Sequence, residues 1–71
     1  MIKLGDTIDV SYGNISKMWL VKDLDLKRRG FDDYYKVLGL QKGNGWWSLN
    51  NGTLKEMRAY MEQYRSEVQN G

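Results

Sequence analysis

The chain has 71 residues, of which 41% are hydrophobic and 28% are charged, a composition typical of one small globular domain with no room for a second. Eleven Lys and Arg against nine Asp and Glu leave a net charge of +2, which by itself does not indicate a polyanionic partner. The absence of Cys and His excludes disulfides, thiolate nucleophiles, imidazole bases and the commonest zinc ligands.

No targeting or membrane segment is recognisable in the sequence. The first residues lack the basic stretch and apolar run of a signal peptide, and the longest apolar run extends only from Met18 to Val21. We therefore expect a cytoplasmic protein with no membrane contact. We also expect a single domain over residues 1–71, with a sheet over about 2–49 and a helix over about 53–69.

Alternating side chains predict two strands in the N-terminal half. From Thr7 to Tyr12 polar and apolar residues alternate, which is typical of a half-buried strand. A second strand is predicted from about Ser16 to Asp23, with apolar residues on both faces. Leu24 and Leu26 continue this alternation, which allows the strand to extend to Lys27. The pattern does not separate a loop from a helical turn over residues 30–33.

Two further strands are predicted on either side of a glycine-rich turn. The residues from Tyr34 to Leu40 alternate, and Gly39 within them predicts a bulge. The turn covers residues 41–45, with the sequence Gln-Lys-Gly-Asn-Gly. A short fourth strand from Trp46 to Leu49 then closes a hairpin.

The C-terminal third predicts an amphipathic helix. Thr53 followed by Glu56 fits a capping box, and steps of three and four residues then mark one apolar stripe. The stripe consists of Leu54, Met57, Met61, Tyr64 and Val68. We interpret it as packing against the sheet, because two heptads are short for a coiled-coil seam. The predicted fold class is α+β: a small curved four-stranded antiparallel sheet followed by one C-terminal helix packed on it, with barrel closure as an open alternative.

Few residues suit catalysis. Asp23 and Asp25 have a spacing that could hold a divalent cation, but the further oxygen ligands of a calcium site are missing. No Ser has a His to activate it, and no glycine-rich phosphate-binding loop is present. We therefore expect a protein that is not an enzyme and uses no cofactor or metal.

The aromatic residues are the most informative feature. A sheet covered by one helix has only one inner face, so the adjacent Trp46 and Trp47 point to opposite faces, as do Tyr34 and Tyr35. We expect one member of each pair in the core and the other on the open face, beside Trp19. Aromatic and basic side chains together bind single-stranded nucleic acid, because bases stack on rings while cations contact phosphates.

The sequence therefore predicts a small protein that binds nucleic acid, DNA or RNA, through its sheet. The expected stacking residues are Trp19, Tyr34 and Trp46. The expected phosphate contacts are Lys22, Lys27, Arg28, Arg29 and Lys36.

Three alternatives stay open. The aromatic rings also fit two other interpretations, core filling in a small domain or a hot spot for a protein partner. In the second case the protein is a stoichiometric inhibitor or adaptor of a host protein, of the kind that small phage or mobile-element genes encode. Homodimerisation is the third, because a free sheet edge or an exposed aromatic face favours self-pairing.

Two segments resemble families that contact nucleic acid. Residues Ile2 to Gly13 resemble the opening of small SH3-like barrels in ribosome- and transcription-associated proteins, although Ser16-Lys17-Met18 stand where that pattern has a later glycine. Ser48-Leu49-Asn50 and the helix after it are similar to the end of a transcriptional-coactivator family, whose members bind single-stranded DNA on a four-stranded sheet backed by a helix. The preceding strands differ in length. Both resemblances imply nucleic-acid contact.

Overall fold

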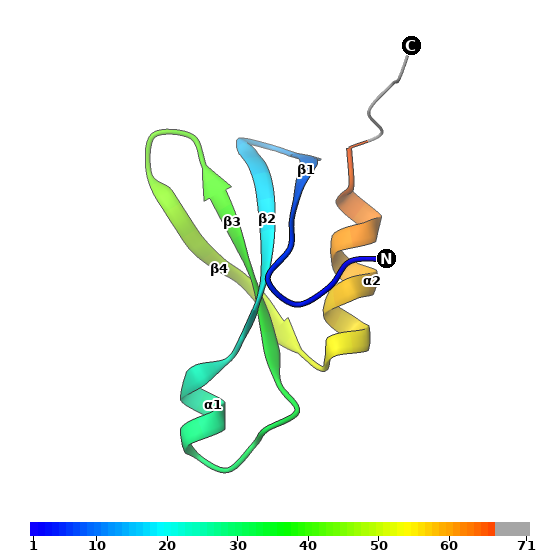
Figure 1. Cartoon of the computed structure of the whole chain (residues 1–71). Helices are drawn as coiled ribbons and strands as arrows, with labels where there is room; N and C mark the ends of the chain where they lie inside the picture. Colours follow the sequence, from blue (N-terminus) through cyan, green and yellow to red (C-terminus); the bar gives the residue numbers. More distant parts are fainter. Residues whose placement is uncertain (67–71) are drawn as a thin grey trace.

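The structure, a computed structural model, describes residues 1–66 and contains four strands and two helices in that range. In chain order the elements are β1 (Thr7–Tyr12), β2 (Ile15–Lys22), α1 (Leu24–Arg28), β3 (Tyr35–Gln41), β4 (Gly45–Gly52) and α2 (Leu54–Tyr64). The strands form one antiparallel sheet in the order β1-β2-β3-β4, and α2 crosses one face of it (Figure 1). The α+β prediction is therefore confirmed.

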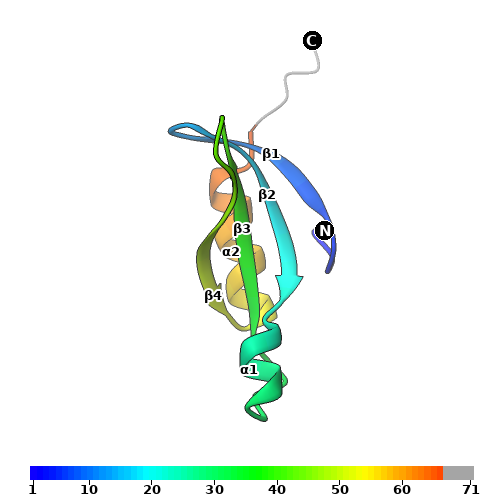
Figure 2. The same cartoon turned by 90° about the vertical axis from the view of Figure 1, so that its left-hand side faces the viewer.

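The sheet is open and does not close into a barrel. β1 and β4 each pair with one neighbour and form the two edges of the sheet. Figure 2 shows the sheet from the side opposite α2, which lies behind it, while α1 lies at one end. Neither helix in residues 1–66 is long and apolar enough to cross a membrane.

The core lies between the sheet and α2. Met18, Leu20 and Val37 project from β2 and β3 and are fully buried. They meet Met57 and Met61 of α2 in one apolar cluster. Because successive strand residues point to opposite faces, the burial of Met18 and Leu20 leaves their neighbours on the open face.

The predicted capping box is present at the start of α2. The Thr53 hydroxyl accepts the Glu56 backbone N–H at 3.2 Å, and the Glu56 carboxylate accepts the Thr53 N–H at 3.0 Å. The predicted apolar stripe is confirmed at Met57 and Met61, whereas Val68 lies outside the described residues. The helix therefore starts where the sequence predicts and packs through the expected face.

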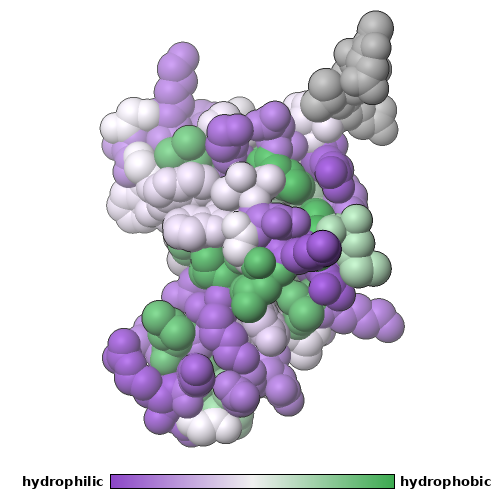
Figure 3. All heavy atoms as spheres, viewed as in Figure 1, coloured by the Kyte–Doolittle hydropathy of each residue, from purple (hydrophilic) through white to green (hydrophobic). Residues whose placement is uncertain are grey.

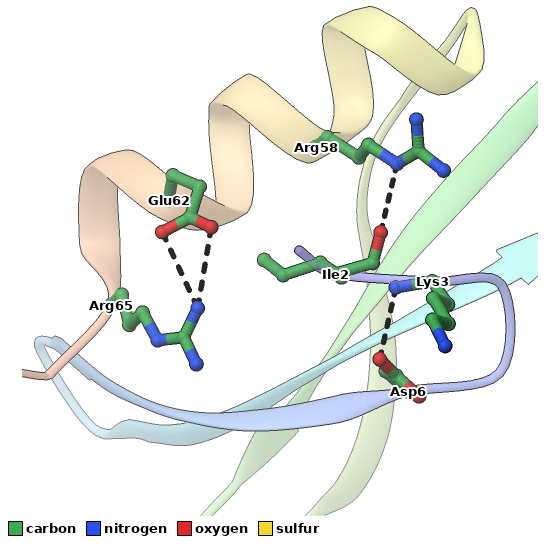
Figure 4. A network of polar contacts seen from close by, with 6 residues as sticks. All are labelled: Ile2, Lys3, Asp6, Arg58, Glu62 and Arg65. Atoms are coloured by element: carbon green, nitrogen blue, oxygen red, sulfur yellow. Dashed lines mark hydrogen bonds and ion pairs between the residues drawn. The ribbon is translucent and has the colours of Figure 1, made fainter.

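α2 ends at Tyr64, before the predicted boundary at residue 69, because the chain then pairs with β1. Arg65 forms an isolated antiparallel bridge with Val10, and the Ser66 N–H donates to the Asp9 carbonyl at 2.9 Å. Figure 4 shows a second attachment of α2, in which Arg58 Nε donates to the carbonyl of the buried Ile2 at 2.8 Å. The helix is thus tied to the N-terminal segment and to the β1 edge.

The predicted extension of the second strand to Lys27 is wrong, because a helix starts at Asp23. Asp23 is the N-cap of α1, and its side chain accepts the Leu26 N–H at 3.1 Å. Gly30, at a φ of +94°, donates its N–H to the Lys27 carbonyl and ends the helical turn. Residues 31–34 then form a loop that leads into β3.

The bulge lies in β4 and not at Gly39. The register shifts between the pairs Val37–Asn50 and Leu38–Ser48, which leaves Leu49 as the extra residue. Gly39 pairs regularly on both sides, and β4 continues to Gly52 instead of ending at Leu49. The predicted fourth strand was therefore too short.

We expect Gly39→Val to destabilise the protein, because the space beside Gly39 is filled. A Cβ at this position would lie 2.5 Å from Leu49 Cδ1 and 2.9 Å from Ile15 Cγ2. Overpacking of this kind costs about 1–3 kcal/mol in the free energy of unfolding, measurable by urea denaturation. Adding Leu49→Ala should recover part of the loss, and a double variant no more stable than Gly39→Val would contradict this explanation.

Candidate nucleic-acid interface

Strand register defines the open face of the sheet, because directly paired residues share a face. Trp19 pairs with Leu38, and Leu40 pairs with Trp46, all on the face away from α2. The rings of Trp19 and Trp46 meet edge to face, with centroids 5.4 Å apart and planes at 60°. Trp46 keeps 40% of its surface exposed. The structure therefore brings two of the three predicted stacking residues together.

Trp47 lies on the helix face, as expected for the neighbour of Trp46, but it does not enter the core. It pairs with Gly39 and remains 56% exposed. α2 starts after the Gly52 end of β4 and finishes beside β1, where the rings of Tyr12 and Tyr64 lie 4.5 Å apart. This diagonal path leaves the other end of β4, with Trp47, uncovered.

A groove of about 420 Å³ lies between the open face and α1. The sheet lines it with Trp19, Val21, Lys36 and Leu38, and α1 lines it with Leu24, Asp25 and Arg28. Figure 3 shows this hollow on the left of the molecule, between the lobe that contains α1 and the upper part of the sheet. The groove thus combines an apolar surface with three basic residues, Lys22, Arg28 and Lys36.

Asp23 holds α1 in position beside the groove. It is 4% exposed, and besides capping α1 it accepts a bond from Asn51 Nδ2 of β4 at 3.5 Å. The pKa of the Asp23 carboxyl lies below its usual value, mainly because the backbone N–H of Leu26 donates to it. Burial acts in the opposite direction and raises the pKa, but the Asn51 side chain and the Lys36 charge add to the lowering. The carboxylate therefore stays ionised and links α1 to the sheet.

We expect Asp23→Asn to remove part of the acid sensitivity of the fold. Because the folded-state pKa of Asp23 lies below its usual 3.8, the carboxylate stabilises the fold fully above about pH 4 and loses this effect as the pH falls through the folded pKa. The stability difference between wild type and Asp23→Asn, measured by urea denaturation, should be constant above about pH 5 and shrink below pH 4. A difference that stays constant at acid pH would contradict this role.

Lys22 lines the same groove, but its ammonium group is engaged elsewhere. It bonds the Asp32 carbonyl, lies 3.5 Å from the Tyr35 hydroxyl and sits 4.5 Å from the centroid of the Tyr35 ring. Burial lowers the pKa of Lys22, but hydrogen bonds to Tyr35 and Asp32 outweigh it and raise the pKa above its usual value. Lys22 therefore lines the groove while Asp32 and Tyr35 hold its ammonium group and leave it little freedom to move.

The other predicted basic residues divide between the groove and its surroundings. Arg28 and Lys36 line the groove, whereas Lys27 on α1 and Arg29 at the C-cap of α1 lie outside its lining. Tyr34 is 36% exposed and contacts Phe31 in the loop before β3, apart from the tryptophan pair. The groove residues Val21, Leu24 and Leu38 were missed by the sequence prediction, although the strand alternation already placed Leu38 beside Lys36.

Charges on this face are partly compensated by neighbouring carboxylates. Lys17 pairs with Asp9 at 2.6 Å, and Arg28 pairs with Asp25 at 3.7 Å. All four side chains are about half exposed or more, so solvent screens these pairs and they contribute little free energy. Lys36 makes no ion pair within residues 1–66. A ligand phosphate can therefore compete for these cations.

Other sites in the described residues offer less chemistry. A hollow of about 950 Å³ between the tips of the two hairpins has only Lys42 as a charged lining residue. Within residues 1–66 no group of three or more Asp and Glu side chains is placed to hold a metal ion. Comparison with known proteins adds no further guide: no family model, no curated protein and no solved structure matches this chain.

Proposed function

We propose that this protein binds single-stranded nucleic acid, in the cytoplasm, across the open face of its sheet. The observation that supports the proposal is the contact between Trp19 and Trp46 on that face, beside a groove lined by Arg28 and Lys36. An aromatic surface next to cations is the arrangement that binds bases and phosphates together without reading sequence.

Stacking supplies most of the expected affinity. Each stacked base contributes about 1–3 kcal/mol, and Trp46 is exposed enough to accept one. Trp19 is half-buried, and its ring contacts the Trp46 ring and supports it. Trp19 also borders the groove, where a second base can lie. The apolar side chains of Val21 and Leu38 suit the face of a base better than they suit a phosphate.

The basic residues contribute through released counterions. For two phosphate contacts on a single strand, the slope of log K against log salt is about −1.4, which corresponds to about sevenfold weaker binding at 200 mM than at 50 mM salt. Lys27 and Arg29 extend the positive charge along α1 beyond the groove. The dependence on salt is therefore modest, in keeping with the net charge of +2.

The test is a titration of a labelled mixed-sequence oligonucleotide, followed by fluorescence anisotropy at several salt concentrations. We expect saturable binding that weakens with salt, and a slope that falls towards zero in the double variant Arg28→Gln with Lys36→Gln. Lys55→Gln, an exposed lysine on α2 at the opposite face, is the matched control and should keep the wild-type slope. Absence of binding at low salt would reject the proposal.

A protein partner is the second candidate, favoured by the apolar side chains around the same groove. Leu24 is 57% exposed and Trp46 is 40% exposed, and exposed tryptophan and arginine side chains dominate protein-binding hot spots. In this case the protein is an inhibitor or adaptor of a host protein, of the phage or mobile-element kind. Its complex should resist salt and form without nucleic acid, which separates it from the first candidate.

A further inference from the structure

The two edge strands of the sheet differ in how they are protected. Each edge strand has an irregular register, but the chain after α2 covers part of the β1 edge through the Arg65–Val10 bridge and the Ser66 N–H. β4 pairs only with β3, so half of its backbone N–H and C=O groups point outward. Figure 2 shows β4 forming one margin of the sheet.

The sequence of β4 contains none of the residues that usually prevent edge pairing. Its eight residues are Gly-Trp-Trp-Ser-Leu-Asn-Asn-Gly, with no charged residue and no proline. Charged residues and prolines are the common means of keeping sheet edges apart. When such a strand pairs with itself in antiparallel orientation, no like charges face each other.

The helix face beside β4 carries a protruding ring and, further along, a groove. Trp47 is 56% exposed, and its indole N–H donates to the Asn44 carbonyl at 3.0 Å, which fixes the ring. A groove of about 490 Å³ lies between the other end of β4 and α2, with Asn50 on one side and Met57 and Tyr60 on the other. The exposed indole and the groove thus lie at opposite ends of one strand.

We propose that two copies of this chain pair through β4 in antiparallel orientation, with Trp47 of each copy seated in the groove between β4 and α2 of the other. The bulge at Leu49 makes this register consistent. Because of it, Trp47 and Asn50 share the helix face, while Trp46 and Asn51 share the open face. Setting Trp47 opposite the partner's Asn50 therefore also sets Trp46 opposite the partner's Asn51, on matching faces.

The arrangement is self-complementary, as a two-fold interface requires. Each copy provides one ring and one groove, so the same contact forms twice about the axis. Pairing joins two four-stranded sheets into one sheet of eight strands, with both α2 helices on one face and both Trp46 side chains on the other. The inference rests on the β4 edge and is independent of what the open face binds.

Sedimentation equilibrium of the whole chain tests the pairing. We expect the mass to rise with concentration from one chain of 8.3 kDa to two. Trp47→Ala should weaken self-association by about tenfold or more, as loss of an interface hot spot does. Phe31→Ala removes a ring of similar exposure, 53%, in the loop before β3, outside the proposed interface, and should leave self-association unchanged. A single-chain mass up to about 1 mM, or equal effects of both variants, would overturn the proposal.

Disulfide trapping tests the register of the two β4 strands and does not depend on the Trp47→Ala variant. The chain has no natural Cys, so cross-links form only at introduced positions. Directly opposed antiparallel residues have Cα atoms about 4.5–5.5 Å apart, within disulfide range. We expect oxidation to cross-link a mixture of Trp46→Cys and Asn51→Cys chains, which both keep Trp47, into heterodimers, and neither variant alone. Failure in the mixture, or equal cross-linking of one variant alone, would overturn the register.

Discussion

Leu20→Ala is expected to lower the free energy of unfolding by about 2–5 kcal/mol. Leu20 is fully buried at the centre of the cluster between the sheet and α2, so its truncation removes apolar contacts and leaves a cavity. Domains have only about 5–15 kcal/mol of stability, and short chains lie at the lower end because they bury less surface. Urea denaturation followed by circular dichroism measures the change.

Leu24→Ala is the matched control for this prediction. It makes the same chemical change at a leucine that is 57% exposed on α1, and it should alter stability by no more than about 0.5 kcal/mol. If the two variants lost similar stability, the core would not lie where the structure has it. If the slope of the unfolding free energy against urea concentration equals that of the wild type, both variants expose the same surface on unfolding.

Trp46→Ala is expected to weaken oligonucleotide binding by about 5- to 150-fold, the loss of one stacked base at about 1–3 kcal/mol. The ring is 40% exposed on the open face and contacts Trp19 at 5.4 Å between centroids. Anisotropy of a labelled oligonucleotide measures the affinity, with protein dilute enough to remain a single chain. Circular dichroism of the variant checks that the fold is kept.

The neighbouring Trp47→Ala provides a control of the same chemistry. Trp47 is more exposed than Trp46, 56% against 40%, but it lies on the helix face. We expect its removal to leave oligonucleotide affinity within about twofold of wild type, while it weakens self-association. Equal loss of binding in both variants would contradict a site confined to the open face.

Local patterns in the sequence predicted most of the fold. The alternation from Thr7 to Tyr12 indicates which residues face the core, and around Met18 it shows which residues share a face, because a strand has a period of two. The capping box at Thr53 depends only on residues three apart, so the start of α2 was also predicted. Boundaries that depend on distant partners were less well predicted. α2 ends early because Arg65 pairs with Val10, far away in the sequence.

α1 shows where local patterns conflict. Leu24 and Leu26 continue the alternation of β2, yet Asp23 caps a helix there and is held by Asn51, a residue of the distant β4. Gly39 is similar, because a glycine within a strand suggests a bulge, whereas Leu49 and Ile15 fill the space beside it. Both outcomes depend on side chains that the sequence around these positions does not reveal.

The sequence predicted one part of the candidate site, and the other part depends on contacts between distant segments. Adjacency alone required Trp46 and Trp47 to point to opposite faces, so the sequence by itself determined that one of them lies on the open face. The tertiary structure decided which one, because α2 packs on the face that holds Met18 and Leu20. It also decided that Arg28 joins Lys36 at a groove, since only the folding of α1 back beside the sheet brings them to one site.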